Sequence, residues 1–345
     1  MFSELECRCQ IVKNFTPSWF ASIMGTGILA LVSIFYGTYF PILKTIGVWL
    51  FYFNVTLFFL LLIPWILRWI FFPKNALSDL YHPVISNFYP TLSVAMLVLS
   101  ANYIVIGKNI HIGETFWFIG TLFTIFFALL TPFIAFRGEH VKLDHINPGW
   151  FIPPVGLIVI PIPGSLIINH VTPALKELVL LLNIFGWGAG FFLYITLLAI
   201  CMYRFILHHP LPGTLAPTIW INLGPIGAGT TALINLVKHT SLMEMREPIY
   251  FFGLLFWSFG IWWVAMAIIM TLYYIRKISI PYAMSWWAFT FPLGAYVSAS
   301  YVVGKTFGVK LIENIGFGLY WLLVLFWVIT LGQTLFNVYR GRVFK

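Results

Sequence analysis

The hydrophobic pattern of the chain divides it into ten long apolar stretches separated by short polar turns. The stretches cover residues 15–36, 41–71, 84–106, 114–136, 149–168, 174–206, 215–237, 248–275, 282–303 and 314–339. About 20 apolar residues are enough for an α-helix to cross a bilayer. Because the turns leave no room for a soluble domain, residues 1–345 are expected to form one all-α integral membrane domain with ten transmembrane helices.

The stretches alternate in character, and the alternation repeats at a nearly constant spacing. The odd-numbered stretches are richer in Gly, Pro, Ser, Thr and Asn, and they open near Pro17, Pro83, Pro148, Pro217 and Met284. A fixed period with one supersecondary unit per repeat is typical of an internally repeated fold. The predicted unit is a helical hairpin, and the five hairpins cover about 15–71, 84–136, 149–206, 215–275 and 282–339.

A glycine or proline follows about eight residues after each of these openings. In the last repeat this position falls at Pro292, where the missing backbone donor is expected to bend the helix next to Phe291. Bends inside a membrane are tolerated only where the freed backbone groups face protein or a watery cavity. The sequence therefore predicts a ring of five kinked helices around one central pore.

Composition and charge narrow the class and orient the chain. The protein is 61% hydrophobic and 8% charged, with a mean hydropathy of +0.94, which excludes a soluble domain of this length. The net charge of +9 does not indicate nucleic acid binding, because the basic residues fall singly at the ends of apolar stretches. Twelve Lys and Arg lie on the side that both termini share and seven on the other, so both termini are expected in the cytoplasm.

The combination of three motifs resembles the tellurite-resistance/dicarboxylate transporter family, which includes yeast malate permease, fungal sulfite exporters and plant slow anion channels. The motifs are Asn14 to Phe20 with Met24 to Gly27, Asn147 to Gly156, and Ser285 to Pro292. The resemblance covers the whole chain. It implies a homotrimer whose protomers each hold ten helices in five hairpins, with the odd helices lining a pore. It also implies that a phenylalanine on the ninth helix plugs the pore, and here that residue is Phe291.

The candidate site follows from the repeat register. Phe291 is the candidate gate, because it precedes the predicted bend and shares its repeat position with smaller residues; packing in the core is the plain alternative. The residues expected to line the pore or contact substrate are Met24, Gly25, Thr26, Asn87, Pro90, Thr91, Pro154, Val155, Gly156, Asn222, Gly224, Pro225, Thr290 and Pro292. The repeated Gly and Pro residues also suit close helix packing, and the two roles are compatible.

A lysine follows each odd stretch on the side opposite the termini. These lysines are Lys44, Lys108, Lys176, Lys238 and Lys305. They are expected either to form an outer basic rim that concentrates anions or to anchor the helix ends by snorkelling. All ten acidic residues fall near the ends of the predicted stretches, so a buried carboxylate relay is not expected.

The predicted function is transport of small anions across the cell membrane by a multi-pass protein in contact with lipid. A dicarboxylate such as malate or succinate, with or without a coupled proton, is the first hypothesis. A gated channel for chloride or nitrate, or a sulfite or tellurite exporter, is the alternative. No enzyme is expected, because no nucleophile–base pair or cofactor motif is present. Neither a cofactor nor a metal is expected, since Cys7 and Cys9 have no partner pair with zinc spacing.

Overall fold

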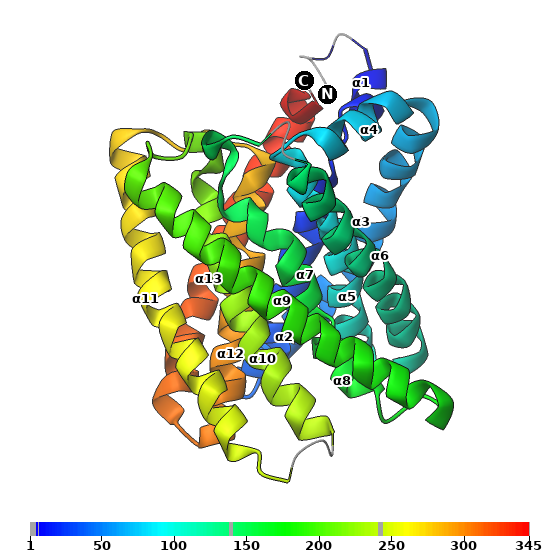
Figure 1. Cartoon of the computed structure of the whole chain (residues 1–345), viewed down its shortest axis with the longest axis vertical. Coiled ribbons are helices and arrows are strands. Elements are labelled where there is room, and N and C mark those ends of the chain that lie inside the picture. Colours follow the sequence, from blue (N-terminus) through cyan, green and yellow to red (C-terminus); the bar gives the residue numbers. More distant parts are fainter. Residues whose placement is uncertain (1–4, 6, 138–140, 241–243, 345) are drawn as a thin grey trace.

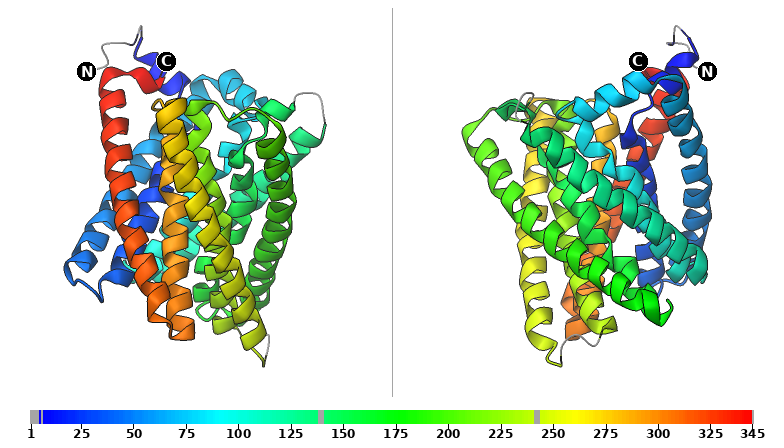
Figure 2. Two further views of the ribbon diagram at one scale, coloured as in Figure 1. Left: turned by 90° about the vertical axis from the view of Figure 1, so that its left-hand side faces the viewer. Right: turned by 45° about the vertical axis from the view of Figure 1, so that its right-hand side comes forward.

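The computed structural model describes residues 5, 7–137, 141–240 and 244–344, and this part of the chain is helical without strands. Five long α-helices recur along it: α3 Ile42–Phe71, α6 Ile110–Phe136, α9 Pro173–Leu207, α11 Glu247–Lys277 and α13 Lys310–Arg340. Both termini lie at the same end of the bundle (Figures 1 and 2). We call this the terminal end, and the opposite one the far end.

Before each long helix the chain forms a shorter segment that changes from a 3₁₀-helix to an α-helix. These inner segments are η1 Pro17–Phe20 with α2 Ala21–Tyr36, η2 Ile85–Phe88 with α5 Pro90–Val105, η4 Pro148–Phe151 with α7 Ile152–Val159 and α8 Pro161–Ile167, η5 Gly213–Asn222 with α10 Leu223–His239, and η6 Met284–Phe289 with α12 Phe291–Phe307. All five run from the terminal end toward the far end (Figure 1). The helices begin and end within four residues of the predicted stretches.

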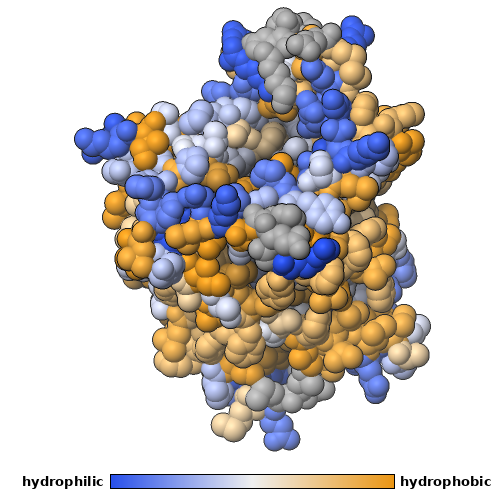
Figure 3. Space-filling view, turned by 45° about the horizontal axis from the view of Figure 1, so that its top comes forward, coloured by the Kyte–Doolittle hydropathy of each residue, from blue (hydrophilic) through white to orange (hydrophobic). Residues whose placement is uncertain are grey.

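Burial separates the inner segments from the long helices. In three inner segments, 78–83% of the most apolar 18-residue window is buried inside the protein. In the long helices the corresponding share is only 22–33%. Most residues of α10 and α12 are also buried. The long helices present exposed Leu, Ile and Phe side chains along their flanks, and the flank seen below the polar terminal end is largely hydrophobic (Figure 3). The protein is therefore a multi-pass membrane protein whose long outer helices surround five buried inner segments.

Eight helical spans are long and apolar enough to cross a membrane. The helices α10 and α12 have 17 residues each, because the preceding part of each segment is a 3₁₀-helix. The stretch predicted at 149–168 is divided into α7 and α8, since Pro161 and Pro163 both lack a backbone donor. A short helix, α4 Pro73–Tyr81, occupies a turn that the hydrophobic pattern left as a linker.

Ion pairs tie the connecting segments to the helix ends. At the terminal end, Arg68 on α3 pairs with Asp79 on α4 at 2.6 Å and donates a hydrogen bond of 2.7 Å to the carbonyl oxygen of Phe15. At the far end, Glu313 at the start of α13 pairs with Lys305 at 3.2 Å and Lys310 at 3.3 Å. Glu4, Glu6 and Glu139 lie outside the described residues. The other acidic residues lie close to helix ends, as the sequence predicted.

The inner helices α10 and α12 approach each other closely at one glycine. A β-carbon on Gly227 would lie 2.4 Å from the backbone carbonyl carbon of Ala295 and 2.4 Å from the backbone nitrogen of Tyr296. Backbone atoms of a packed helix cannot move aside as the end of a flexible side chain can. The crossing of α10 and α12 therefore requires glycine at this position.

We predict that Gly227→Ala destabilises the protein, because the added methyl group forces the two helix backbones apart. Overpacking of this kind costs about 1–3 kcal/mol. The measurement is the thermal unfolding midpoint of the purified protein in detergent. Gly188→Ala on α9 is the matched control, since nothing lies within 4 Å of its added β-carbon. A Gly227→Ala protein as stable as the Gly188→Ala protein would contradict the close crossing.

Candidate functional site

Two small cavities lie among the inner segments, and every inner segment contributes to both. The near cavity is on the terminal side and has a volume of about 40 Å³. It is lined by Ala21, Met24, Phe88, Thr91, Ile152, Val155, Ile221, Gly224, Met284, Ser285, Trp287, Ala288, Phe291 and Pro292. The far cavity has a volume of about 30 Å³ and is lined by Ile28, Leu31, Leu97, Val98, Ala101, Val159, Ile162, Pro163, Ala228, Thr231, Phe291, Ala295 and Ser298.

Phe291 lines both cavities and lies where they adjoin. Its side chain is buried, with 6% of its surface exposed. About 10–15 Å³ of cavity volume is enough for one water molecule, so each cavity has room for only a few waters. The two cavities lie one after the other among the inner segments, with the ring of Phe291 between them, and we call this line of cavities the axial path.

The cavity-lining positions follow the helical period from one level to the next. On α2, Met24 in the near cavity is followed by Ile28 and Leu31 in the far cavity. The same spacing of four and seven residues holds for Val155, Val159 and Ile162, for Gly224, Ala228 and Thr231, and for Phe291, Ala295 and Ser298. Residues at this spacing share one face of an α-helix. On α5 the near-cavity residue is Thr91 instead of the neighbouring Pro90.

The position of Phe291 depends on the junction between η6 and α12. Pro292 is the second residue of α12, where a missing backbone donor leaves no intrahelical bond unmade. The expected bend is therefore a change from 3₁₀- to α-helix, and Phe291 is the first α-helical residue after it. Thr290, fully buried, donates a hydrogen bond of 2.7 Å to the carbonyl oxygen of Trp287. A β-carbon on Gly25 would clash with the Thr290 hydroxyl, so α2 holds this junction from the other side.

Five of the fourteen predicted lining residues, namely Met24, Thr91, Val155, Gly224 and Pro292, line the near cavity. The other nine line neither of the two cavities: Gly25, Thr26, Asn87, Pro90, Pro154, Gly156, Asn222, Pro225 and Thr290. Thr26 accepts a hydrogen bond of 3.0 Å from Trp327 on α13, which places its hydroxyl toward an outer helix. Gly156 faces α5 and α6, since an added β-carbon would lie 3.0 Å from Thr124 and 3.2 Å from Val94.

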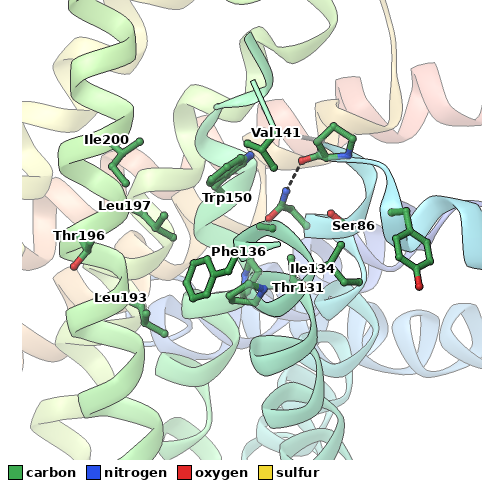
Figure 4. A pocket seen from close by; sticks show the side chains of 16 residues that line it. Ser86, Thr131, Ile134, Phe136, Val141, Trp150, Leu193, Thr196, Leu197 and Ile200 are labelled. Atoms are coloured by element: carbon green, nitrogen blue, oxygen red, sulfur yellow. Dashed lines mark hydrogen bonds between the residues drawn. The ribbon is translucent and has the colours of Figure 1, made fainter. Parts of the chain in front are cut away.

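Asn87 contributes to a different cavity, a groove of about 180 Å³ between α6 and α9 (Figure 4). Leu193, Thr196, Leu197 and Ile200 of α9 form one wall, and Thr131, Ile134 and Phe136 of α6 form part of the other. The amide group of Asn87 donates a hydrogen bond of 2.9 Å to the carbonyl oxygen of Pro83. The groove lies between two outer helices and is almost entirely apolar. It is larger than the two axial cavities and is not part of the path through the inner segments.

The five predicted rim lysines are all exposed. Lys176 and Lys238 line one far-end pocket of about 340 Å³, together with Arg246 and His239. Lys305 is paired with Glu313. Two of the five lysines thus contribute to a basic surface, while a third shares the carboxylate of Glu313 with Lys310.

The two axial cavities are lined by uncharged side chains. The described residues that line the two cavities include no Asp, Glu, Lys, Arg or His. The α-helical parts of all five inner segments begin at the level of the near cavity, with Ala21, Ile152 and Phe291 each the first residue of its α-helix. Each α-helix continues a 3₁₀-helix, and the N–H groups at the junction donate to carbonyl oxygens of that 3₁₀-helix, as those of Ala21 and Ile152 do to Ser18 and Gly149. The backbone therefore completes its own hydrogen bonds at the level of the near cavity.

Sequence analysis missed most of the apolar lining. Phe88, Ile152, Ile221 and Trp287 line the near cavity, and the far cavity beyond Phe291 was not anticipated. The register of the five repeats was available, and extending it by four and seven residues along each helix identifies most far-cavity residues. The spacing of four and seven residues is therefore the signal in the sequence that marks these hydrophobic residues.

Comparison with known proteins places this geometry in a family. The pattern of the voltage-dependent anion channel family (SLAC1) matches residues 14–335. An uncharacterized transporter of Methanocaldococcus jannaschii is 60% identical over 100% of this chain and 99% of the relative. A sulfite efflux pump of Trichophyton rubrum is 24% identical over 97% of this chain and 93% of the relative. A malic acid transport protein of Schizosaccharomyces pombe is 24% identical over 93% of this chain and 77% of the relative.

These matches confirm the resemblance that the motifs indicated, and the names of the relatives are those of transporters and channels, not of enzymes. The chain belongs to the voltage-dependent anion channel family, which includes the tellurite-resistance/dicarboxylate transporters.

Proposed function

We propose that the protein moves small anions across the membrane along the axial path, and that Phe291 is its gate. The observation that carries the proposal is the position of Phe291 between two cavities to which all five inner segments contribute. A hydrophobic constriction closes a channel by excluding water, and a single large ring among smaller neighbours is sufficient for this. At the level of Phe291 the neighbouring positions Val155 and Gly224 are smaller.

The lining supports selection of anions. A charge at the centre of a bilayer costs about 2.5–3.5 kcal/mol on insertion scales. The described residues that line the two cavities include no carboxylate that could replace the hydration shell of a cation, whereas the buried hydroxyl of Thr231 is available to donate to an anion.

For the substrate we propose a dicarboxylate such as malate or succinate, passing end-on so that one carboxylate group at a time occupies the constriction. The malic acid transport protein supports this choice. Sulfite is the second candidate, because the sulfite efflux pump is aligned over a larger share of both chains. The test is flux into proteoliposomes for malate, succinate, sulfite and chloride, with and without a pH gradient. Accumulation against a gradient indicates coupled transport, and flux that follows voltage alone indicates a channel.

The same proposal includes the arrangement in the membrane. Each inner segment and the outer helix after it form one hairpin, which gives ten crossings in five repeats. The terminal end faces the cytoplasm. The protein lies in the plasma membrane and forms a homotrimer there. The excess of Lys and Arg at that end supports this orientation.

We predict that cysteines introduced at Lys44 and Lys176 react with a membrane-impermeant maleimide from outside intact cells, because both lie exposed at the far end. Cysteines at Lys142 and Lys277, exposed at the terminal end, should react only after the cells are opened. The background must lack Cys7, Cys9 and Cys201. Labelling of the Lys277 position in intact cells would reverse the proposed orientation.

The gate makes a sharper prediction. Phe291→Ala should join the near and far cavities, let water enter the constriction and raise anion flux at least several-fold over the parent protein. The flux is measured in proteoliposomes loaded with the same amount of folded protein. If Phe291 served only to pack the core, its truncation would cost about 3–5 kcal/mol of stability and would lower flux.

Phe289→Ala is the matched control for the gate. Phe289 is also 6% exposed, but its ring packs against Trp220 at 6.1 Å and Phe326 at 5.0 Å, away from the axis. It should lose stability without gaining flux. A Phe291→Ala protein that folds well and conducts no better than the parent would refute the gate.

A further inference from the structure

The two cavities differ in the state of their hydroxyl groups. In the near cavity, Thr91 lies 2.7 Å from the carbonyl oxygen of Pro17 and 2.6 Å from that of Phe88, so its proton is already donated. Ser285 there donates to the carbonyl oxygen of Thr214. In the far cavity, the hydroxyl of Thr231 is buried and has no hydrogen-bond partner among the described residues. An unpartnered buried hydroxyl is costly unless a ligand or water completes it.

A second hydroxyl lies on the same cavity, on the neighbouring helix. The backbones of α10 and α12 meet at Gly227 and Ala295. Thr231 follows Gly227 by four residues and Ser298 follows Ala295 by three, so both side chains come one turn beyond the crossing. Thr231 and Ser298 are each 4% exposed, and both line the far cavity next to Phe291.

The geometry points to an anion-binding subsite formed by the Thr231 and Ser298 hydroxyls on the far side of Phe291. The inference rests on the proposed function. The cavity of about 30 Å³ admits one compact group, such as chloride, sulfite or a single carboxylate, stripped of most of its water. Two hydroxyl donors replace part of the lost hydration, and they impose no fixed charge that would hold the anion in place.

The subsite is tested in the Phe291→Ala background, where the constriction is open. Thr231→Val has nearly the shape of threonine and removes the hydroxyl. Thr231→Val and Ser298→Ala should each raise the half-saturating concentration of chloride and of sulfite about ten-fold, the loss expected for one hydrogen bond to a charged group. Thr231→Ser, which keeps the hydroxyl, should give the same half-saturating concentration as Phe291→Ala alone.

Thr230→Val is the matched control. Thr230 is the neighbouring residue on α10, is fully buried, and makes a long contact of 3.5 Å with the carbonyl oxygen of Gly253 toward α11. It should leave half-saturation unchanged. If Thr231→Val and Ser298→Ala conduct with the same half-saturation as Thr230→Val, the subsite is refuted while the anion path stands. If neither the parent nor Phe291→Ala conducts any of the tested anions, the proposed function fails and the subsite fails with it.

Discussion

Backbone hydrogen bonding in an apolar medium is the constraint on which the rest of the structure depends. A proline in a membrane helix leaves a carbonyl without its donor, and each such group costs several kcal/mol in hydrocarbon. Pro90, Pro153 and Pro292 fall in the first turn of their α-helices, where no intrahelical donor is needed. The 3₁₀-helices that precede them make their own short bonds, such as Tyr89 to Ser86 and Thr290 to Trp287. The broken inner segments are thus stable, provided that they stay away from lipid.

The outer helices supply that shelter and also hold the inner backbones in place. Tryptophan side chains on three of them donate hydrogen bonds of 2.9 Å to carbonyl oxygens of inner segments: Trp117 to Ile160, Trp187 to Gly229 and Trp263 to Ile219. Each indole covers a large apolar area and places one donor, which suits an interface where one side is dry and the other carries backbone oxygens. The inner ring is therefore fixed by directional bonds as well as by packing, and its axial side chains keep a common register.

Much of this architecture could be predicted because it depends on length and period. Apolar stretches long enough to span a bilayer predicted the helices. The spacing of the repeat openings from Pro17 to Met284 predicted the register, and the structure places Met24, Val155, Gly224 and Phe291 around one cavity. The direction of individual polar side chains could not be predicted. Thr26 and Thr290 look like pore-lining hydroxyls in the sequence, yet one accepts a bond from Trp327 and the other bonds its own 3₁₀ turn. Thr231 and Thr230 carry the same hydroxyl, and only the seven-residue spacing from Gly224 indicates that Thr231 is the one that lines the far cavity.

A path without charged side chains has consequences for selectivity. A lysine beside Phe291 would attract anions strongly, but it would also slow their release, because attraction between charges at a few ångström is strong where water is excluded. Hydroxyl groups attract an anion more weakly than a lysine does, so under the proposed function an anion passes the far cavity without a deep minimum. Discrimination then depends on the cost of dehydration and on the width at Phe291. Those two quantities change with the few residues that line the cavities, so the same backbone can serve different anions after only a few substitutions on the axis.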